Sequence, residues 1–347
     1  MIVVTTGFLI TIPIFALAIS AAMTWYSSKP ESFLYILDHP NERSLHEKPI
    51  PRNGGVAIVL SIAVGFLILC AVNYCTKSLL LISISMIIMS IISYVDDRDH
   101  LSVKTRLIGQ FLCVLIVVAN GVIIKPSFLP DITFDLPVWV ITILTIVYIV
   151  WMINLYNFMD GMDGFASGMT IIGFTTFAIF GLIAGDIIFT ISSVIIVAAS
   201  TGFLIFNFPP ARIFMGDSGS ASLGLLAGAF SVWGRNADIF PFWIAVIIFS
   251  PFITDATITL IQRTFRKEKI WQAHKTHYYQ RLVEMGWDHR KTVLFEYTLM
   301  LLCSLFAIIA MKLTTYQKWF ILIVAVLMYM TLAYFVDKKY KSFTTEH

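Results

Sequence analysis

Long apolar runs separated by short polar breaks make up most of the chain. Several runs approach the roughly 20 residues that an α-helix needs to cross the ~30 Å hydrocarbon core of a bilayer. Between breakers such as proline, glycine and charged residues, eleven runs stand out: residues 2–26, 54–74, 78–95, 106–125, 137–153, 166–184, 187–206, 219–234, 240–261, 292–312 and 317–337. Residues 79–95, for example, are apolar on every side, whereas strands of a membrane barrel alternate apolar and polar positions. The pattern predicts an all-α, polytopic membrane bundle of about eleven transmembrane helices, or ten.

The composition supports this prediction. Of 347 residues, 58% are hydrophobic and 13% are charged, far from the usage of soluble proteins. We find no low-complexity tract, internal repeat or sizeable soluble segment, so we expect residues 1–347 to form a single integral membrane domain. The first run has no positive charge ahead of it, which favours a transmembrane helix over a cleaved signal peptide.

Lysine and arginine gather on one side of the predicted bundle. The loops after runs 1, 3, 5, 7 and 9, together with the C terminus, hold all but five of the 24 Lys and Arg residues. The five exceptions are Lys77, Lys125, Arg235, Lys312 and Lys318. By the positive-inside rule the rich side is cytoplasmic, with the C terminus, and the N terminus lies on the opposite side.

Five polar motifs fall on this same predicted cytoplasmic side. They occupy residues 43–55, 96–106, 154–164, 207–220 and 274–282. Ionisable groups are costly inside a bilayer, so we expect these motifs at the membrane–water interface. Five motifs at one end of a helical bundle predict a single site.

Two motifs carry paired acidic side chains. Asp96 and Asp97 end the third run, where they could bind a divalent cation, act as a base, or simply stop the helix in water. Asp160 and Asp163 are each followed by glycine. If their segment is helical, their i, i+3 spacing places both carboxylates on one face, close to the amides at positions 154 and 157; the alternative is an Asx-rich turn.

The remaining motifs also allow two interpretations each. Asp217 follows a double proline and could bind a metal or cap the next helix. In the most basic loop, two histidines, a glutamine and an arginine occupy positions 274, 277, 280 and 281. They could donate hydrogen bonds to a diphosphate, or the loop could be a topology signal that contacts anionic lipids. Residues 43–55 form a basic turn that could serve only topology, and Asp255 could either reach the interface or face the bundle interior.

The cysteines give no metal or redox motif. Cys70, Cys75, Cys113 and Cys303 lie in or beside apolar runs and lack the spacing of a zinc site. We therefore expect all four to be small buried hydrophobic side chains.

Together these motifs resemble the polyprenyl-phosphate N-acetylhexosamine-1-phosphate transferases, glycosyltransferase family 4, which includes the phospho-N-acetylmuramoyl-pentapeptide translocase. The resemblance runs from about residue 43 to residue 282. It rests on Asp-Asp-Arg followed by Leu-Ser-x-Lys-x-Arg (96–106), Asn-Phe-Met-Asp-Gly-Met-Asp-Gly (157–164), Phe-Met-Gly-Asp-Ser-Gly-Ser (214–220) and His-x-x-His-Tyr-Tyr-Gln-Arg-Leu (274–282). The last motif and the Pro-Arg-x-Gly-Gly turn resemble the O-antigen-initiating branch most.

The resemblance implies a reaction and a set of site residues. Undecaprenyl phosphate attacks the β-phosphate of a UDP-N-acetylhexosamine, giving undecaprenyl-diphosphate sugar and UMP, with Mg²⁺ required and Mn²⁺ able to substitute. By position, Asp96, Asp97 and Asp160 match catalytic residues and Asp217 matches the principal metal ligand. The residues matched to substrate binding are Asn157, Asp163, Asn207, Phe214, His274, His277, Arg281 and Arg52.

The resemblance also implies a setting. It places the chain in the bilayer of a bacterial inner membrane, with a periplasmic N terminus, at the first membrane step of O-antigen or other cell-surface polysaccharide synthesis. It allows a homodimer and gives no reason to expect a nucleic-acid partner.

Two other functional classes fit less well. A transporter or flippase for a lipid-linked sugar places its polar groups near the membrane midplane and shows related halves, whereas these motifs lie at run ends and no half-repeat is visible. A CDP-alcohol phosphotransferase would show an Asp-Gly-x-x-Ala-Arg motif, which this sequence lacks.

Overall fold

The computed structural model describes residues 6–40, 45, 48–99, 101–119, 121–125, 128–269 and 274–346. Within these residues the protein is all-α apart from one short hairpin, which confirms the predicted fold class. The elements are α1 (Thr6–Ser27), β1 (Ile36–Asp38), β2 (Ile50–Arg52), α2 (Gly54–Ala71), α3 (Lys77–Asp99), α4 (Val103–Val118), α5 (Val138–Met159), α6 (Phe165–Ala184), α7 (Ile187–Asn207), α8 (Asp217–Asn236), α9 (Phe242–Ile248), α10 (Ser250–Phe265), α11 (Tyr278–Glu284), α12 (His289–Ala310) and α13 (Thr315–Glu346).

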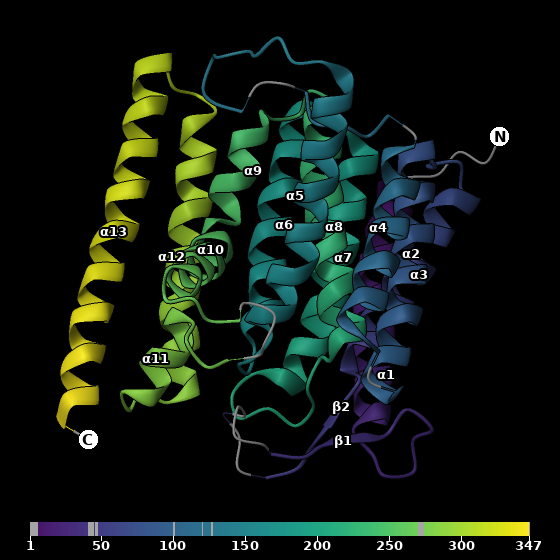
Figure 1. Cartoon of the computed structure of the whole chain (residues 1–347). Coiled ribbons are helices and arrows are strands. Elements are labelled where there is room, and N and C mark those ends of the chain that lie inside the picture. The colour runs from purple at the N-terminus through teal and green to yellow at the C-terminus, as the bar shows by residue number, and fades with distance from the viewer. Residues whose placement is uncertain are drawn as a thin grey trace.

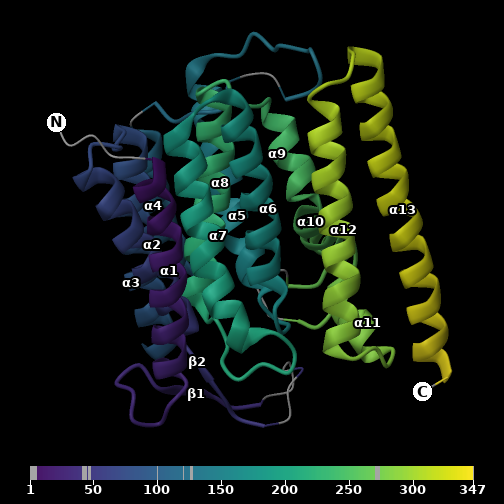
Figure 2. The ribbon, with the colours of Figure 1, turned by 180° about the vertical axis from the view of Figure 1, so that it is seen from behind.

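The long helices run side by side as one bundle (Figure 1). One end of the bundle carries the β1–β2 hairpin, the short helix α11 and the end of α13, while α1 begins at the other end. The view from behind shows α1 lying along α7, and the two helices are in extensive contact (Figure 2). The five polar motifs can therefore meet at one common end. Residues 43–44 and 46–47 of the first motif and residue 100 of the second lie outside the described residues.

A helix covers each of the eleven expected runs, although not all of these helices satisfy the length and composition of a membrane span. Among the described residues eight helices do so, and a ninth span results if α9 and α10 count as one. The expected runs 106–125 and 219–234 correspond to α4, which has 16 residues, and to α8. α8 is rich in small and polar residues because it is buried along residues 218–234 against α2, α3 and α5 and does not face lipid.

The ninth expected run, residues 240–261, is broken. α9 and α10 meet at an angle of 78°. Pro251 lies at the start of α10, where its missing N–H and fixed φ favour a new helix over continuation of α9. The bend turns Asp255 into the bundle interior, so the alternative that it reaches the interface is wrong.

The hairpin and the start of α2 are joined to the segment before α8. β1 and β2 pair antiparallel. Directly after β2, the N–H groups of Gly54 and Gly55 donate to the carbonyls of Phe214 and Met215 at 3.0 and 2.9 Å. A Cβ on Gly55 would lie 2.3 Å from the Cα of Gly219 on α8, so only glycine permits this approach. The sequence did not predict the hairpin, because strands of three residues carry no periodic signal.

The cysteine prediction is half correct. Cys113 and Cys303 are buried and free, as expected. Cys70 and Cys75 instead form a disulfide, because the turn after α2 brings their Cα atoms to 4.4 Å. This turn lies at the end of α2 away from the hairpin.

Candidate active site

Two adjacent cavities occupy the end of the bundle where the motifs meet. The first measures about 520 Å³ and the second about 360 Å³. Asn157, Asp217, His274 and Gln280 line both cavities and so form their common wall. Eleven of the twelve residues that the resemblance assigned line one cavity or both: Arg52, Asp96, Asp97, Asn157, Asp160, Asp163, Asn207, Phe214, Asp217, His274 and His277.

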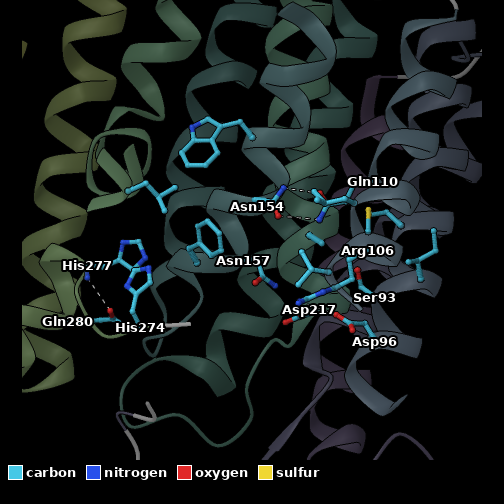
Figure 3. A pocket seen from close by; sticks show the side chains of 18 residues that line it. Ser93, Asp96, Arg106, Gln110, Asn154, Asn157, Asp217, His274, His277 and Gln280 are labelled. Atoms are coloured by element: carbon cyan, nitrogen blue, oxygen red, sulfur yellow. Dashed lines mark hydrogen bonds and ion pairs between the residues drawn. The ribbon is translucent and has the colours of Figure 1, made fainter. Parts of the chain in front are cut away.

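The first cavity is lined by both polar and apolar side chains, and Figure 3 labels the polar ones. Its apolar lining comes from the membrane helices α3, α4, α5 and α10: Met89, Ile92, Leu107, Trp151, Phe158 and Leu260. Gln110 and Asn154 also line it and exchange hydrogen bonds of 2.8 and 3.4 Å with each other. An elongated ligand with an apolar tail and a charged head fits such a lining.

The second cavity is lined mainly by turns and loops. Asp160 to Asp163 supply one wall, Asn207 and residues 214–217 a second, and Leu45 and His289 a third. Asn207 is held rigidly, because its side chain accepts from Gly164 N and donates to the Ile213 carbonyl, both at 2.9 Å. The polar lining suits a hydrophilic ligand.

Asp97 caps α8 from another helix. Its carboxylate accepts the backbone N–H groups of Asp217 and Ser218 at 3.3 and 3.2 Å, and the residue is buried. Arg52 lies 3.5 Å from the same carboxylate and also donates to the Asp97 carbonyl. The suggestion that Asp217 is itself the N-cap residue of α8 is wrong. The N-cap residue is Gly216, which has no side chain to accept a hydrogen bond, and the carboxylate of Asp217 lines both cavities instead.

Arg106 lies between two acidic side chains. Its Nη1 is 3.4 Å from Asp96 Oδ2 and 4.0 Å from Asp217 Oδ2. Asp96 also accepts the Leu101 N–H at 2.8 Å, which holds the start of α4 against the end of α3. Sequence reasoning did not single out Arg106, although it lies in the 96–106 motif. Among the described residues it is the one Lys or Arg side chain that lines the first cavity.

The expectation of two aspartates on one helical face is wrong. α5 ends at Met159, and Gly161 and Gly164 help to form the turn that follows, with φ of Gly164 at 72°. Asp160 and Asp163 are in that turn, and both still line the second cavity. Burial, followed by the carboxylates of Asp217, Asp97 and Asp163, raises the pKa of Asp160 well above its ordinary value.

The shift reflects carboxylates gathered near Asp160, of which Asp97, Asp163 and Asp217 also line the second cavity. No group of three or more His, Cys, Asp or Glu side chains in the described chain is arranged to hold a metal by itself. Mg²⁺, however, typically uses one or two carboxylates and completes its shell with water and substrate phosphate oxygens. The donor set around Asp217 and Asp160 therefore fits Mg²⁺.

The histidine loop is positioned by α10. Asp255 accepts His277 Nδ1 at 3.0 Å and the N–H groups of Tyr278 and Tyr279 at 3.0 and 3.2 Å, so it caps α11 and orients the imidazole. His277 lies beside His274, with ring centroids 4.7 Å apart. Burial, followed by the charges of His277 and Arg263, lowers the pKa of His274 to about 4, so this ring is neutral at pH 7.

Arg281 lies outside both cavities. It is buried and contacts Asp337 on α13 at 2.5 Å, Gln262 on α10 at 3.0 Å and the Thr276 carbonyl at 2.8 Å. The structure therefore gives it a supporting role for α11 and no contact with the cavities. Helical spacing alone could not reveal this, since Asp337 follows 56 residues later.

Comparison with known proteins points in one direction. Residues 79–235 match the family model of glycosyl transferase family 4. The chain is 32% identical over 315 residues to a probable undecaprenyl-phosphate N-acetylglucosaminyl 1-phosphate transferase of Bacillus subtilis, covering 89% of this chain and 87% of the relative. It is 30% identical to a decaprenyl-phosphate N-acetylglucosaminephosphotransferase of Mycobacterium tuberculosis (80% and 77% covered) and 31% identical to a phospho-N-acetylmuramoyl-pentapeptide-transferase of Desulforamulus reducens (74% and 80% covered).

Proposed function

The chain belongs to glycosyl transferase family 4, the membrane enzymes that transfer a sugar 1-phosphate to a polyprenyl phosphate, and from this premise we propose its substrates and the roles of its residues. The donor is a UDP-N-acetylhexosamine, first of all UDP-N-acetylglucosamine, because the Bacillus and mycobacterial relatives are named for that sugar. The acceptor is undecaprenyl phosphate, and the products are the lipid diphosphate sugar and UMP.

The observation that carries this proposal is the pair of cavities with a common wall. The first cavity, with its apolar lining from membrane helices, fits the lipid phosphate, and the polar second cavity fits the nucleotide sugar. Two substrates bound there would present their phosphates to each other at Asp217 and Asn157. An oxygen of the lipid phosphate then forms a bond to the β-phosphorus as the bond from that phosphorus to the UMP oxygen breaks.

Residues on both sides of the common wall offset the repulsion between the two anions. Each pair of unit charges at ~4 Å costs about 4 kcal/mol at an effective dielectric of 20. Arg106 on the first cavity and Arg52 on the second place a cation at each phosphate. Asp217 and Asp160 would hold Mg²⁺, or Mn²⁺ in its place, which supplies charge neutralisation and polarises the phosphoryl oxygens. Gln280 on the common wall and His277 in the first cavity orient the reacting phosphates, and Asp96 positions the lipid phosphate in the first cavity. Asp97 lines the second cavity and bonds to the backbone of Asp217 on the common wall, where it can accept the proton of the lipid phosphate.

The proposed setting follows the charge pattern. The protein lies in a bacterial inner membrane. The end that carries the cavities faces the cytoplasm, where nucleotide sugars are made, and the N terminus is periplasmic. The reaction is the first membrane step in building a cell-surface polysaccharide, either an O-antigen or a cell-wall polymer.

UMP release by the purified protein tests the proposal. We expect release only when UDP-N-acetylglucosamine, undecaprenyl phosphate and Mg²⁺ are all present. Asp217→Asn and Asp97→Asn should each abolish turnover while the protein still folds, because an asparagine oxygen at position 97 can still accept the N–H groups of α8. Near-wild-type turnover by folded Asp217→Asn would remove the metal assignment. Movement of a preformed lipid-linked sugar across vesicles without UMP release would instead support a flippase.

A further inference from the structure

His289 is the first residue of α12 and lines the second cavity, although no motif pointed to it. Its Nδ1 lies 3.4 Å from Asp163 Oδ2, and the Leu45 backbone is a second hydrogen-bond partner of the ring. The side chain is 21% exposed, so it is neither fully buried nor free in water. His289 therefore joins the turn after α5 to Leu45 in the lining of the second cavity.

Asp163 is held by one of its two oxygens. Oδ2 accepts the Ala211 N–H at 2.9 Å and faces His289, so both contacts fall on the same atom. Among the described residues no hydrogen bond to Oδ1 is found, and Asp163 lines the cavity beside Asn207 and Phe214. Two donors on Oδ2 fix the plane of the carboxylate and leave Oδ1 to accept a hydrogen bond from a ligand.

α12 does not need His289 in order to begin. Its N-cap is Asp288, whose carboxylate accepts the Lys291 N–H at 2.6 Å. The contacts of His289 with Asp163 and Leu45 are thus additional to the cap. They do not satisfy any requirement of the helix itself, which points to a role in the cavity.

We propose that His289 is a positioning residue for the nucleotide: it orients Asp163 toward the uridine half of the donor and holds the Leu45 backbone in the lining of the same cavity. The inference rests on the proposed function, since it requires a uridine nucleotide in the second cavity. His289 lines the second cavity but not the first, and its partners Asp163 and Leu45 are not residues of the common wall. It should therefore affect nucleotide binding and leave the chemical step alone.

The test measures nucleotide affinity and turnover in the detergent-purified protein. His289→Ala should weaken binding of UMP and of UDP-N-acetylglucosamine by the same factor, about tenfold, the usual effect of removing one hydrogen bond to a charged group. The KM for the donor should rise by that factor, while kcat changes less than twofold. His289→Asn, whose amide nitrogen can replace Nδ1 opposite Asp163, should recover most of the affinity. Asp288→Ala is the matched control: it removes the cap one residue away and should lower the melting temperature without changing UMP affinity.

Three outcomes would overturn the inference. One is equal UMP affinity in the wild type and His289→Ala, and another is a loss confined to kcat. In the third outcome, His289→Ala and Asp288→Ala lower the melting temperature by the same amount and neither changes UMP affinity. His289 would then have a structural role only. If His289→Ala does not fold, the test is the affinity of His289→Asn for UMP. A tenfold loss of that affinity with a normal melting temperature would contradict the expectation that asparagine replaces the histidine. Failure of the proposed function looks different, because the wild type itself would then bind neither nucleotide.

Discussion

A single methyl group at Gly55 should damage the active site through the backbone. Gly55 on α2 touches Gly219 on α8, and an alanine Cβ there would lie 2.3 Å from both the Cα and the N of Gly219. Ordinary contacts begin near 3.4 Å, so Gly55→Ala must push the two helices apart by about 1 Å. Because the atoms in the way belong to the backbone, no rotamer change can absorb this displacement.

The displacement falls on the first turn of α8. Asp217 starts that helix two residues before Gly219, and Asp97 holds its N–H groups. We expect the overpacking to cost about 1–3 kcal/mol of stability. A shift of ~1 Å in a group that positions a reacting phosphate can lower the rate by about 100-fold. The assay is kcat for UMP release at saturating substrates, together with a melting curve to show that the variant is folded.

Gly65→Ala is the matched control on the same helix. Its new Cβ would meet Cγ2 of Ile195 at 2.7 Å, a side chain that can turn away. We expect a modest loss of stability and a kcat within twofold of the wild type. A Gly55→Ala enzyme with more than a third of wild-type kcat, or a Gly65→Ala enzyme that is equally impaired, would refute the argument from backbone contact.

Two further predictions concern the histidine loop. Because the folded state lowers the pKa of His274 to about 4, below the unfolded value near 6.5, its contribution to stability is present above pH 6.5 and is lost as the pH falls toward 4. The melting temperature of the wild type should therefore drop more than that of His274→Asn between pH 6.5 and 4.5; parallel curves would contradict this. Asp337→Ala leaves buried Arg281 without its carboxylate and should cost roughly 2 kcal/mol and lower kcat several-fold, because α11 carries Gln280 into the wall between the cavities. Asp131→Ala removes the ion pair that Lys318, at the other end of α13, makes with the segment before α5, and it should leave kcat unchanged. An equal effect of both variants on kcat would rule out a local role.

The sequence predicted the helices well because the length of an apolar run follows from the thickness of the hydrocarbon core that a helix must cross. It predicted the ninth run as one unbroken helix, which is wrong. Pro251 indicates a break, but an apolar stretch of 22 residues has the length of a single membrane span. The count of spans also depends on context. α8 is helical where expected, but its small residues reflect packing against neighbouring helices, which no local pattern reveals.

The site was predictable as a gathering of motifs and less so as a set of contacts. The charge pattern alone placed the acidic, amide and histidine motifs at one end, and the structure brings them to two cavities. The partners of each side chain depend on residues far along the chain. Asp97 serves the helix that begins 120 residues later, and His289 meets Asp163 across a similar distance in sequence. Such pairings leave no local signature, which is why Arg281 was expected in the site and His289 was not.

The fate of the donor's β-phosphate tests the central proposal most directly. UDP-N-acetylglucosamine labelled with ³²P at that phosphorus is incubated with the purified protein, undecaprenyl phosphate and Mg²⁺, and the lipid is then extracted into butanol. We predict that the label enters the lipid fraction in equal amount to the UMP released, and that Asp217→Asn transfers none. Sugar in the lipid with the labelled phosphate left on UDP, or no lipid product beside a folded wild-type protein, would contradict the account.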